Sequence, residues 1–352
     1  MIKVTALTSG QNVPSTRFRI RQHIDQLRNF NIDVVEHYPA ISKDKPAPFS
    51  HTGSASAFSL PFKVAFSATK LLATVPGILS SYRTDVTWLS RGILLGIPTL
   101  EAILKQPVIL DVDDAIWLRN GRIARGSHYL ASNTKAIIAG NSYIAEWYSQ
   151  YSDNVHIVPT AVDTDRYRPS EMSSSVKFTI GWIGTKHNLQ YLKRLEPPLA
   201  KFFRKNENSV LLVVSDEEPK FSKLDGINVQ YVRWSKANEV RLIQNMDVGL
   251  MPLGDTPWNR GKCAYKMLQY MSCGKPVVVS PVGMNVEVLE KDNIGFSAID
   301  NEEWYLALSE LKQNEPLRRR MGINARNIVL TYYSSAAIAP RIAKIIRGVV
   351  KT

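Results

Sequence analysis

The chain has 352 residues, of which 44% are hydrophobic and 21% are charged, and its formal net charge is +13. This balance excludes an intrinsically disordered chain, and the length is sufficient for two domains of ordinary size. The basic excess favours an anionic partner: a nucleic acid, an anionic membrane surface or a phosphorylated substrate.

Three simpler assignments are disfavoured by the motifs that the sequence lacks. It has no Cys/His finger and no RNA-reading aromatic motif, so we do not expect nucleic acid as a partner. The two cysteines, Cys263 and Cys273, have no metal-ligand spacing, and neither a disulfide framework nor a metal site is expected. The chain begins directly with a strand-like run rather than a signal peptide, so a cytoplasmic location is expected.

Short apolar segments alternate with helical ones along the first half of the chain. Helical periodicity covers residues 15–30, and strands are expected at 2–7, 32–36, 85–89, 108–111, 136–139 and 155–158. Such an alternation predicts a parallel sheet with helices on both faces.

Residues 60–82 form the most apolar stretch of the first half. Lys63, Lys70 and Pro76 interrupt it, so it falls short of a membrane-spanning helix. Two readings stay open: a core helix under the first sheet, or an amphipathic helix that docks on an anionic membrane with its lysines and Arg83.

A second series of strands begins near residue 177 and predicts a second doubly wound domain. Its further strands are expected at 209–214, 228–232, 248–251 and 276–280. We place the first domain at 1–165 and the second at 166–335, and a C-terminal helix at 336–352 could cross back to the first domain. Two such domains facing each other bind ligands in a central cleft, at the carboxyl ends of their strands.

The segment 258–285 carries the pattern of a phosphate-binding site. Three cations, Arg260, Lys262 and Lys266, precede or begin a predicted helix, and the turn after the next strand offers the amides of Gly283 and Met284 beside Asn285. Helix N-termini and fixed cations stabilise phosphate and a departing diphosphate. The alternative is a solvated helix face, on which Lys262 and Lys266 lie four residues apart.

Two other strand ends of the second domain supply weaker candidates. The turn after the first strand contains Gly184 and Lys186, although the spacing GxGxxG of a dinucleotide fingerprint is absent. Gly184 is explained equally well by a tight turn. Arg233 and Trp234 follow the strand at 228–232 and are placed beside a nucleotide base, whereas a tryptophan is more often part of the core.

In the first domain, Asp113 and Asp114 come just after the strand VILD. Paired carboxylates at a strand end can orient an acceptor hydroxyl or accept its proton. Metal binding, or a cap or Asx-turn role for one of the two, are the alternatives.

The order IGWIGTKHN, VQYVRWS and DVGLMPLGDTPWNRGKCAYKMLQYMSCGKPVVVSPVGMN resembles the nucleotide-binding domain of glycosyltransferase family 4. The resemblance is specific over residues 177–330 and weaker in the first half. It implies the GT-B fold, with two Rossmann-like domains about a cleft. It also implies transfer of a sugar from a nucleotide diphosphate with retention, usually without a metal or other cofactor.

The resemblance assigns roles to further residues. Gln269 stands where the family has the second Glu of a Glu-x7-Glu motif, which holds the ribose hydroxyls, and Gly261 stands where the first Glu would be. In similar enzymes the loop after the first strand reaches the diphosphate and acceptor, which implicates Gly10, Arg17 and Arg19. The acceptor domain of such enzymes often faces a membrane, in agreement with the second reading of residues 60–82.

The leading hypothesis from the sequence is therefore a retaining glycosyltransferase of surface polysaccharide or lipopolysaccharide synthesis. It would bind a nucleotide-sugar donor and a glycan or lipid-linked acceptor, on the inner face of the plasma membrane. A non-catalytic nucleotide- or glycan-binding component of an assembly complex is the alternative. A Rossmann-type oxidoreductase is disfavoured by the missing GxGxxG spacing.

Overall fold

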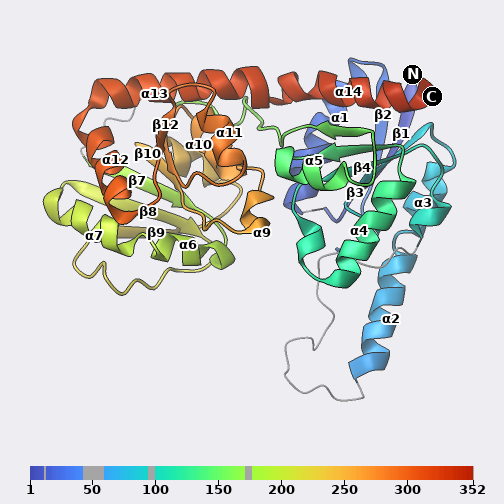
Figure 1. Cartoon of the computed structure of the whole chain (residues 1–352), viewed down its shortest axis with the longest axis horizontal. Helices are drawn as coiled ribbons and strands as arrows, with labels where there is room; N and C mark the ends of the chain where they lie inside the picture. Colours follow the sequence, from blue (N-terminus) through green and yellow to red (C-terminus); the bar gives the residue numbers. More distant parts are fainter. Residues whose placement is uncertain (12, 43–58, 94–99, 171–176, 352) are drawn as a thin grey trace. The chain divides into compact units, whose positions relative to one another are not determined.

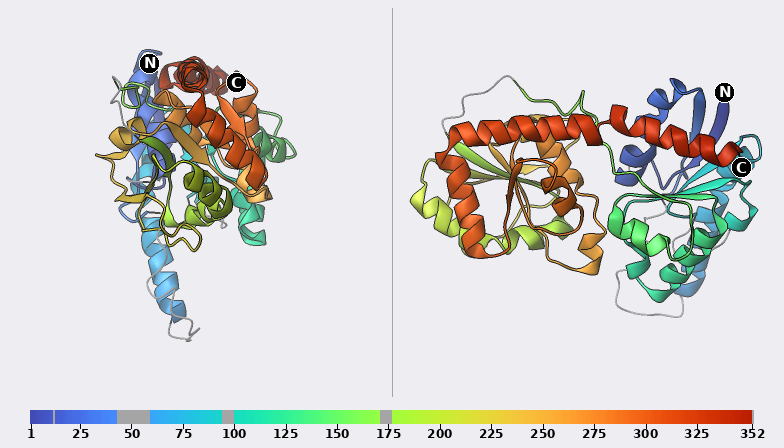
Figure 2. Two further views of the ribbon diagram at one scale, coloured as in Figure 1. Left: turned by 90° about the vertical axis from the view of Figure 1, so that its left-hand side faces the viewer. Right: turned by 45° about the horizontal axis from the view of Figure 1, so that its top comes forward.

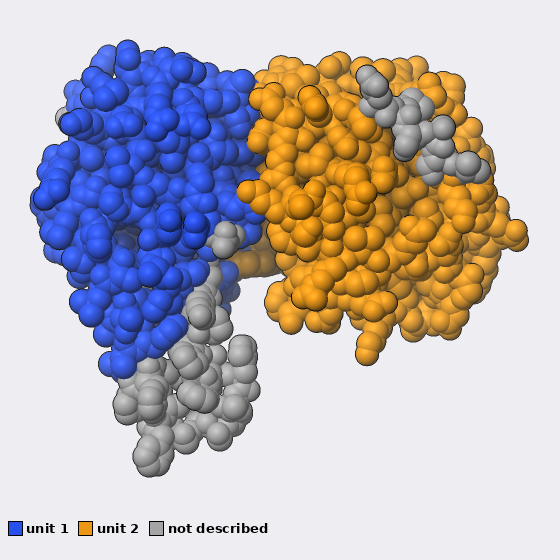
Figure 3. Space-filling view, turned by 180° about the vertical axis from the view of Figure 1, so that it is seen from behind, with its two compact units in different colours: residues 1–161, 335–352 blue, residues 162–334 orange. Residues whose placement is uncertain are grey.

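The computed structural model describes residues 1–11, 13–42, 59–93, 100–170 and 177–351. They form two compact units, one made of residues 1–161 and 335–352 and the other of residues 162–334 (Figure 3). The chain passes between the units twice. The boundaries expected from the sequence lay at 165/166 and 335/336.

Unit 1 contains a six-stranded, fully parallel sheet with the order β2-β1-β3-β4-β5-β6. Its register places Val4 beside both Val34 and Val86, so β-branched residues fill the centre of the sheet. The strands are β1 (Ile2–Leu7), β2 (Ile32–His37), β3 (Val86–Ser90), β4 (Val108–Val112), β5 (Ala136–Ala139) and β6 (Val155–Ile157).

The helical segments of unit 1 cover both faces of its sheet (Figures 1 and 2). The continuous helix expected over residues 15–30 is divided into a π-helical turn, a 3-10 turn and a short α-helix. The segments are η1 (Thr16–Ile20), η2 (Arg21–His23), α1 (Ile24–Arg28), α2 (Ser59–Leu72), α3 (Val75–Ser81), η3 (Glu101–Ile103), η4 (Ile116–Leu118), α4 (Gly121–Asn133), α5 (Ser142–Tyr148) and α14 (Ser335–Lys351).

The C-terminal helix α14 completes the core of unit 1 although it is more than 150 residues away in sequence from the rest of that unit. Ile338, Ile342, Ile346 and Val349 recur at helical spacing and are buried against residues that include Trp88 of β3. An apolar stripe of this kind buries hydrophobic surface, and α14 thereby contributes part of the core that residues 1–161 do not supply by themselves.

Unit 2 contains a second six-stranded parallel sheet, with the order β12-β11-β10-β7-β8-β9. The edge strand β12 was not expected from the sequence, because its residues GFS contain a single apolar side chain between a glycine and a serine. The strands are β7 (Phe178–Ile183), β8 (Ser209–Ser215), β9 (Val229–Arg233), β10 (Val248–Met251), β11 (Val277–Val279) and β12 (Gly295–Ser297).

Helices also cover both faces of the unit 2 sheet (Figure 2). The helix predicted within the segment 258–285 begins at Tyr265, directly after Ala264, which is in the left-handed region with a φ of 49°. The helical segments are η5 (Lys186–Asn188), α6 (Leu189–Lys193), α7 (Glu196–Lys205), α8 (Glu239–Gln244), α9 (Pro257–Arg260), α10 (Tyr265–Ser272), α11 (Met284–Leu289), α12 (Asn301–Gln313), α13 (Glu315–Ile328) and η6 (Val329–Tyr333).

Helix α10 is held closely against the strands that end at the predicted phosphate site. A Cβ added to Gly249 of β10 would lie 2.3 Å from the ring of Tyr270, so only glycine permits this approach. The backbone N–H of Ile183, the last residue of β7, donates a hydrogen bond of 2.8 Å to the Tyr270 hydroxyl. These contacts hold α10 against β7 and β10.

Candidate functional site in unit 2 and its counterpart in unit 1

Lys266 of α10 lies at the carboxyl end of β7. Its ammonium lies 5.0 Å from the centre of the Trp182 ring, a cation–π arrangement. A Cβ added to Gly184 would lie 2.6 Å from Nζ of Lys266 and 2.4 Å from the Trp182 ring. Glycine at position 184 therefore leaves the space that the lysine occupies.

The environment of Lys266 disfavours its charge. The pKa of this ammonium is lowered to about 7, chiefly by burial and also by the nearby charge of Lys262, while Asp216 opposes the shift. The residue as a whole is half-buried. A bound anion next to Lys266 would favour the charged form of its ammonium.

Arg260, at the end of α9, is exposed and makes two hydrogen bonds to Asp255, of 2.7 and 2.8 Å. These bonds lower the pKa of Asp255. The backbone of Arg260 packs against Gly283, whose φ is 55° and whose Cβ, if present, would lie 2.5 Å from the Arg260 carbonyl oxygen. The predicted turn is thus brought beside the predicted cation.

In that turn, Gly283 and Met284 stand at the N-terminus of α11, where backbone N–H groups have no intrahelical acceptor. The side chain of Asn285 is not placed as the sequence suggested. Its side chain is buried, and its amide donates to the Ser280 carbonyl at 2.9 Å. Asn285 therefore shapes the turn and does not present its side chain to a ligand.

Three weaker candidates of unit 2 are exposed near the ends of β7 and β9: Lys186, Arg233 and Trp234. The backbone N–H of Lys186 donates to Asp216 at 2.6 Å, and its ammonium lies 3.7 Å from Glu217. Arg233 is exposed, and the indole N–H of Trp234 donates to the Glu239 carboxylate at 3.1 Å. Their contacts to a nucleotide stay predictions.

The structure places Gln269, which the resemblance assigned to the ribose hydroxyls, in the interior of unit 2. Only 3% of the residue is exposed, and its amide nitrogen donates to the Tyr167 hydroxyl at 2.8 Å and to Glu239 at 3.2 Å. Burial and the adjacent Glu239 raise the pKa of Tyr167. Gln269 thus belongs to a buried polar network together with Glu239 and Tyr167, which pattern reasoning had not singled out.

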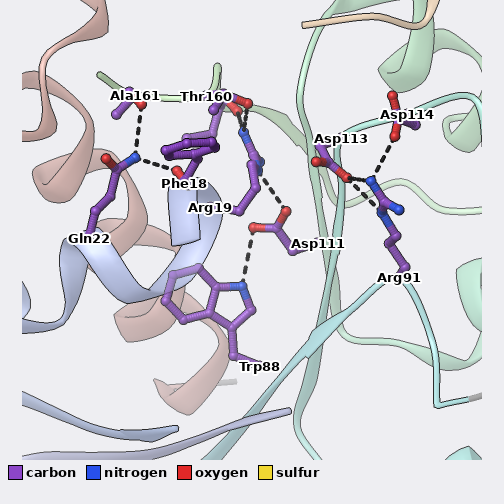
Figure 4. A network of polar contacts seen from close by, with 11 residues as sticks. Phe18, Arg19, Gln22, Trp88, Arg91, Asp111, Asp113, Asp114, Thr160 and Ala161 are labelled. Atoms are coloured by element: carbon purple, nitrogen blue, oxygen red, sulfur yellow. Dashed lines mark hydrogen bonds and ion pairs between the residues drawn. The ribbon is translucent and has the colours of Figure 1, made fainter. Parts of the chain in front are cut away.

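In unit 1, Asp113 and Asp114 both bind one guanidinium, that of Arg91 (Figure 4). The closest N–O distance is 2.7 Å to each carboxylate, and Arg91 has a φ of 62°, which is unusual for a residue with a side chain. Arg91 follows β3 and the two aspartates follow β4, so neighbouring strand ends supply the cluster. The role of Arg91 was missed, because nothing in the sequence pairs it with residues 22 positions away.

Arg19 was predicted to reach the diphosphate, and the structure contradicts this. Its side chain is 3% exposed, pairs with Asp111 at 2.9 Å and donates to the Val158 carbonyl at 2.7 Å (Figure 4). Burial raises the pKa of Asp111, and the Arg19 guanidinium opposes that shift. Trp88 donates its indole N–H to the same carboxylate at 3.3 Å. Arg19 is therefore a core residue of unit 1.

The other two candidates of unit 1 lie near the end of β1. Gly10 is buried with a φ of 153°, and an added Cβ would lie 3.1 Å from Cβ of Ser42. The half-buried Arg17 places its guanidinium 4.8 Å from the centre of the Phe18 ring. Their roles toward a ligand stay predictions. Among the described residues, no group of three or more His, Cys, Asp or Glu side chains is placed to hold a metal ion.

Several solved structures share the whole fold of the chain at low sequence identity. HepE of Anabaena in complex with UDP-glucose has a TM-score of 0.70 and 14% identity over 99% of this chain and 100% of its own. Sucrose-phosphate synthase of Thermosynechococcus elongatus has a TM-score of 0.69 and 14% identity over 99% of both chains. WaaG, described as a glycosyltransferase involved in lipopolysaccharide biosynthesis, has a TM-score of 0.66 and 15% identity over 99% and 100%. No curated protein matches the sequence.

The two parallel six-stranded units define a protein of the GT-B type. Residues 177–314 match the family model described as glycosyl transferases group 1. The expected resemblance to this glycosyltransferase family is confirmed over residues 177–314, and the expected fold class is confirmed.

Proposed function

We propose that unit 2 binds the diphosphate of a nucleotide sugar with Lys266, Lys262 and Arg260. The observation that carries the proposal is Lys266, a half-buried cation at the carboxyl edge of a parallel sheet whose pKa is lowered to about 7. Ligands of open α/β sheets bind at this edge. The similarity to HepE, which was solved with UDP-glucose, supports a donor of this class.

The enzyme transfers the sugar to a glycan or lipid-linked acceptor with retention, in the synthesis of surface polysaccharide or lipopolysaccharide. The bond between C1 and the diphosphate oxygen breaks, the diphosphate keeps the electron pair, and the lysines and Arg260 stabilise its added charge. The acceptor oxygen forms the new bond to C1 and loses its proton. Asp113 and Asp114 are the proposed acceptors of that proton.

A thermal-shift panel with UDP, GDP, UDP-glucose and NAD tests the donor class. The nucleotide that binds should stabilise the protein by about 2.7 kcal/mol at a concentration of 100 times its Kd. NAD should give no shift. Incubation of the binding sugar nucleotide with glycan acceptors, followed by NMR of the product anomer, then tests transfer and retention. Binding without transfer to any acceptor would favour a non-catalytic role instead.

We also propose that unit 1 associates peripherally with an anionic membrane at the inner face of the plasma membrane through α2 and α3. Leu72 and Leu79 are 70% and 61% exposed, and α2 extends from the body of unit 1 (Figure 1). Residues 64–81 have the length and hydropathy of a membrane span, but a turn at 73–74 divides them between the two helices. Lys70 is buried against Phe66, so its expected basic contribution is absent, whereas Arg83 is exposed. The side chain of Lys63 lies outside the described part of the chain.

Flotation with liposomes containing phosphatidylglycerol tests this membrane proposal. Exposed leucines contribute apolar burial in the interface, so Leu72→Glu together with Leu79→Glu should abolish co-flotation. Leu306→Glu, at a residue that is 55% exposed on α12 of unit 2, is the matched control and should float like the unmodified protein. Equal flotation of the double variant, or binding that resists high salt and alkaline carbonate as an integral span would, contradicts the proposal.

A further inference from the structure

A basic pocket lies at the opposite edge of the unit 2 sheet from Lys266. Asp247 directly precedes β10, and Lys275 comes two residues before β11, so these residues mark the amino ends of the strands. Residues of α13 form the other wall, and the pocket has a volume of about 470 Å³. This volume is within the range of pockets that hold small-molecule ligands.

The charges that line the pocket are unbalanced. Among the described residues that line the pocket, four cations face two carboxylates, which leaves an excess of two positive charges; the residues are Lys275, Arg318, Arg319, Arg326, Asp247 and Glu315. A concave surface with one dominant sign of charge concentrates counter-ions of the other sign. The excess matches the charge of a phosphate monoester dianion.

Two of the arginines are fixed by the protein itself. Arg326 donates to the carbonyls of Tyr167 and Ser272 at 2.7 and 2.8 Å. Arg318 donates to the Leu311 carbonyl at 2.7 Å and lies 3.7 Å from Asp247. These hydrogen bonds therefore position the two guanidinium groups at the wall of the pocket.

The other two cations are the candidates for direct contact with an anion. Burial lowers the pKa of Lys275, Arg318 lowers it further, and Asp247 opposes the shift. No described residue receives a hydrogen bond from the Lys275 ammonium. Arg319 is paired with Glu315 at 2.6 Å, but both side chains are more than half exposed. An exposed ion pair contributes little free energy, so Arg319 can leave Glu315 to bind an anion.

The two walls of the pocket are in direct backbone contact. A Cβ added to Gly322 of α13 would lie 2.3 Å from the carbonyl oxygen of Gly274, and Gly274 itself has a φ of 70°. Helix α13 therefore packs directly on the backbone that presents Lys275. A preformed site loses little free energy to reorganisation when a ligand binds.

We infer that this pocket is a second binding site, for a small phosphate-bearing anion, separate from the donor site. Phosphate fits better than a carboxylate, because it carries up to two charges and its oxygens accept bonds from several donors at once. Free phosphate and a phosphorylated sugar share this chemistry. The inference does not depend on the proposed function, since none of the residues of the donor site line the pocket.

Isothermal titration of the full chain with inorganic phosphate and, separately, with glucose 6-phosphate tests the inference, in the presence of saturating nucleotide to occupy the donor site. Lys275→Met and Arg319→Gln should each weaken binding about tenfold or more, since each removes a charge-assisted hydrogen bond. Arg320→Gln is the matched control, because Arg320 is exposed on the same helix and does not line the pocket. It should bind like the unmodified protein.

The two probes distinguish the source of the phosphate: tighter binding of glucose 6-phosphate indicates a metabolite, and equal binding indicates phosphate itself. Lys266→Met should retain the binding, which separates this pocket from the donor site. Unchanged affinity in Lys275→Met and Arg319→Gln, loss of binding in Lys266→Met, or no binding of either probe at millimolar concentration would overturn the inference. Arg319→Gln keeps the test valid if Lys275→Met does not fold, because Arg319 is exposed.

Discussion

Replacement of Lys266 by methionine is expected to lower kcat/KM for sugar transfer about 100-fold. Fixed cations that meet developing charge contribute on the order of 3 kcal/mol each, and about 1.4 kcal/mol corresponds to a factor of ten in rate. Lys266 is held in position by Trp182 and by the space that Gly184 leaves. The measurement is steady-state transfer with the donor identified by the binding panel.

The pH profile gives Lys266 a signature that a structural role would not produce. Its ammonium is charged below its pKa of about 7, and the charged form is the one that binds the diphosphate. Because kcat/KM reports the free enzyme, it should fall as the pH rises above about 7. In Lys266→Arg this fall of kcat/KM should occur at much higher pH, and in Lys266→Met it should be absent.

A matched control is Lys201→Met, on α7. Lys201 is partly exposed, pairs with Glu302 and lies 4.1 Å from the centre of the Tyr305 ring, away from the strand ends of the site. Its activity should equal that of the unmodified enzyme. Full activity of Lys266→Met, with a folded protein by circular dichroism, would remove Lys266 from the mechanism and with it the main support for the proposed donor site.

The sequence predicts the fold of this chain well for definite physical reasons. A fully buried parallel strand such as β8 is recognised by its apolar run VLLVV between two serines. The helix α10 and the turn at Gly283 follow from periodicity and glycine placement. The three-residue strand β12 has no such signal. The division of residues 15–30 into η1, η2 and α1 was also missed, since the apolar spacing alone favoured one helix.

The site is predicted less completely, because charge and burial are decided by neighbours that are distant in sequence. Arg19 and Gln269 have the residue types expected of ligand contacts, yet both are buried in polar networks. The pairing of Arg91 with Asp113, 22 residues later, cannot be predicted from a local sequence pattern. In contrast, Lys266 and Gly184 were both identified from their places after strands or at a helix start, while the contact between them required the structure.

Asp111→Ala is expected to destabilise unit 1 by about 3–5 kcal/mol, the usual cost of removing one partner of a buried ion pair. Arg19 is 3% exposed, and the substitution would leave its guanidinium without a carboxylate partner in the core. The indole N–H of Trp88 would lose its acceptor as well. The free energy of unfolding of a domain is usually about 5–15 kcal/mol, so a loss of this size should lower the midpoint of urea denaturation by a large amount.

The isosteric variant Asp111→Asn separates charge from volume. It retains an oxygen that can accept a hydrogen bond from Trp88 or Arg19, so a loss of similar size would show that the ionic partner, and not the cavity, is responsible. The pair itself need not be a net source of stability. Replacement of both members by apolar residues, as in Arg19→Met with Asp111→Leu, should recover much of the loss, because no charge then remains buried. A double variant as unstable as Asp111→Ala would instead show that the Arg19 bonds to Val158 and Thr160 are needed to hold η1 against the sheet.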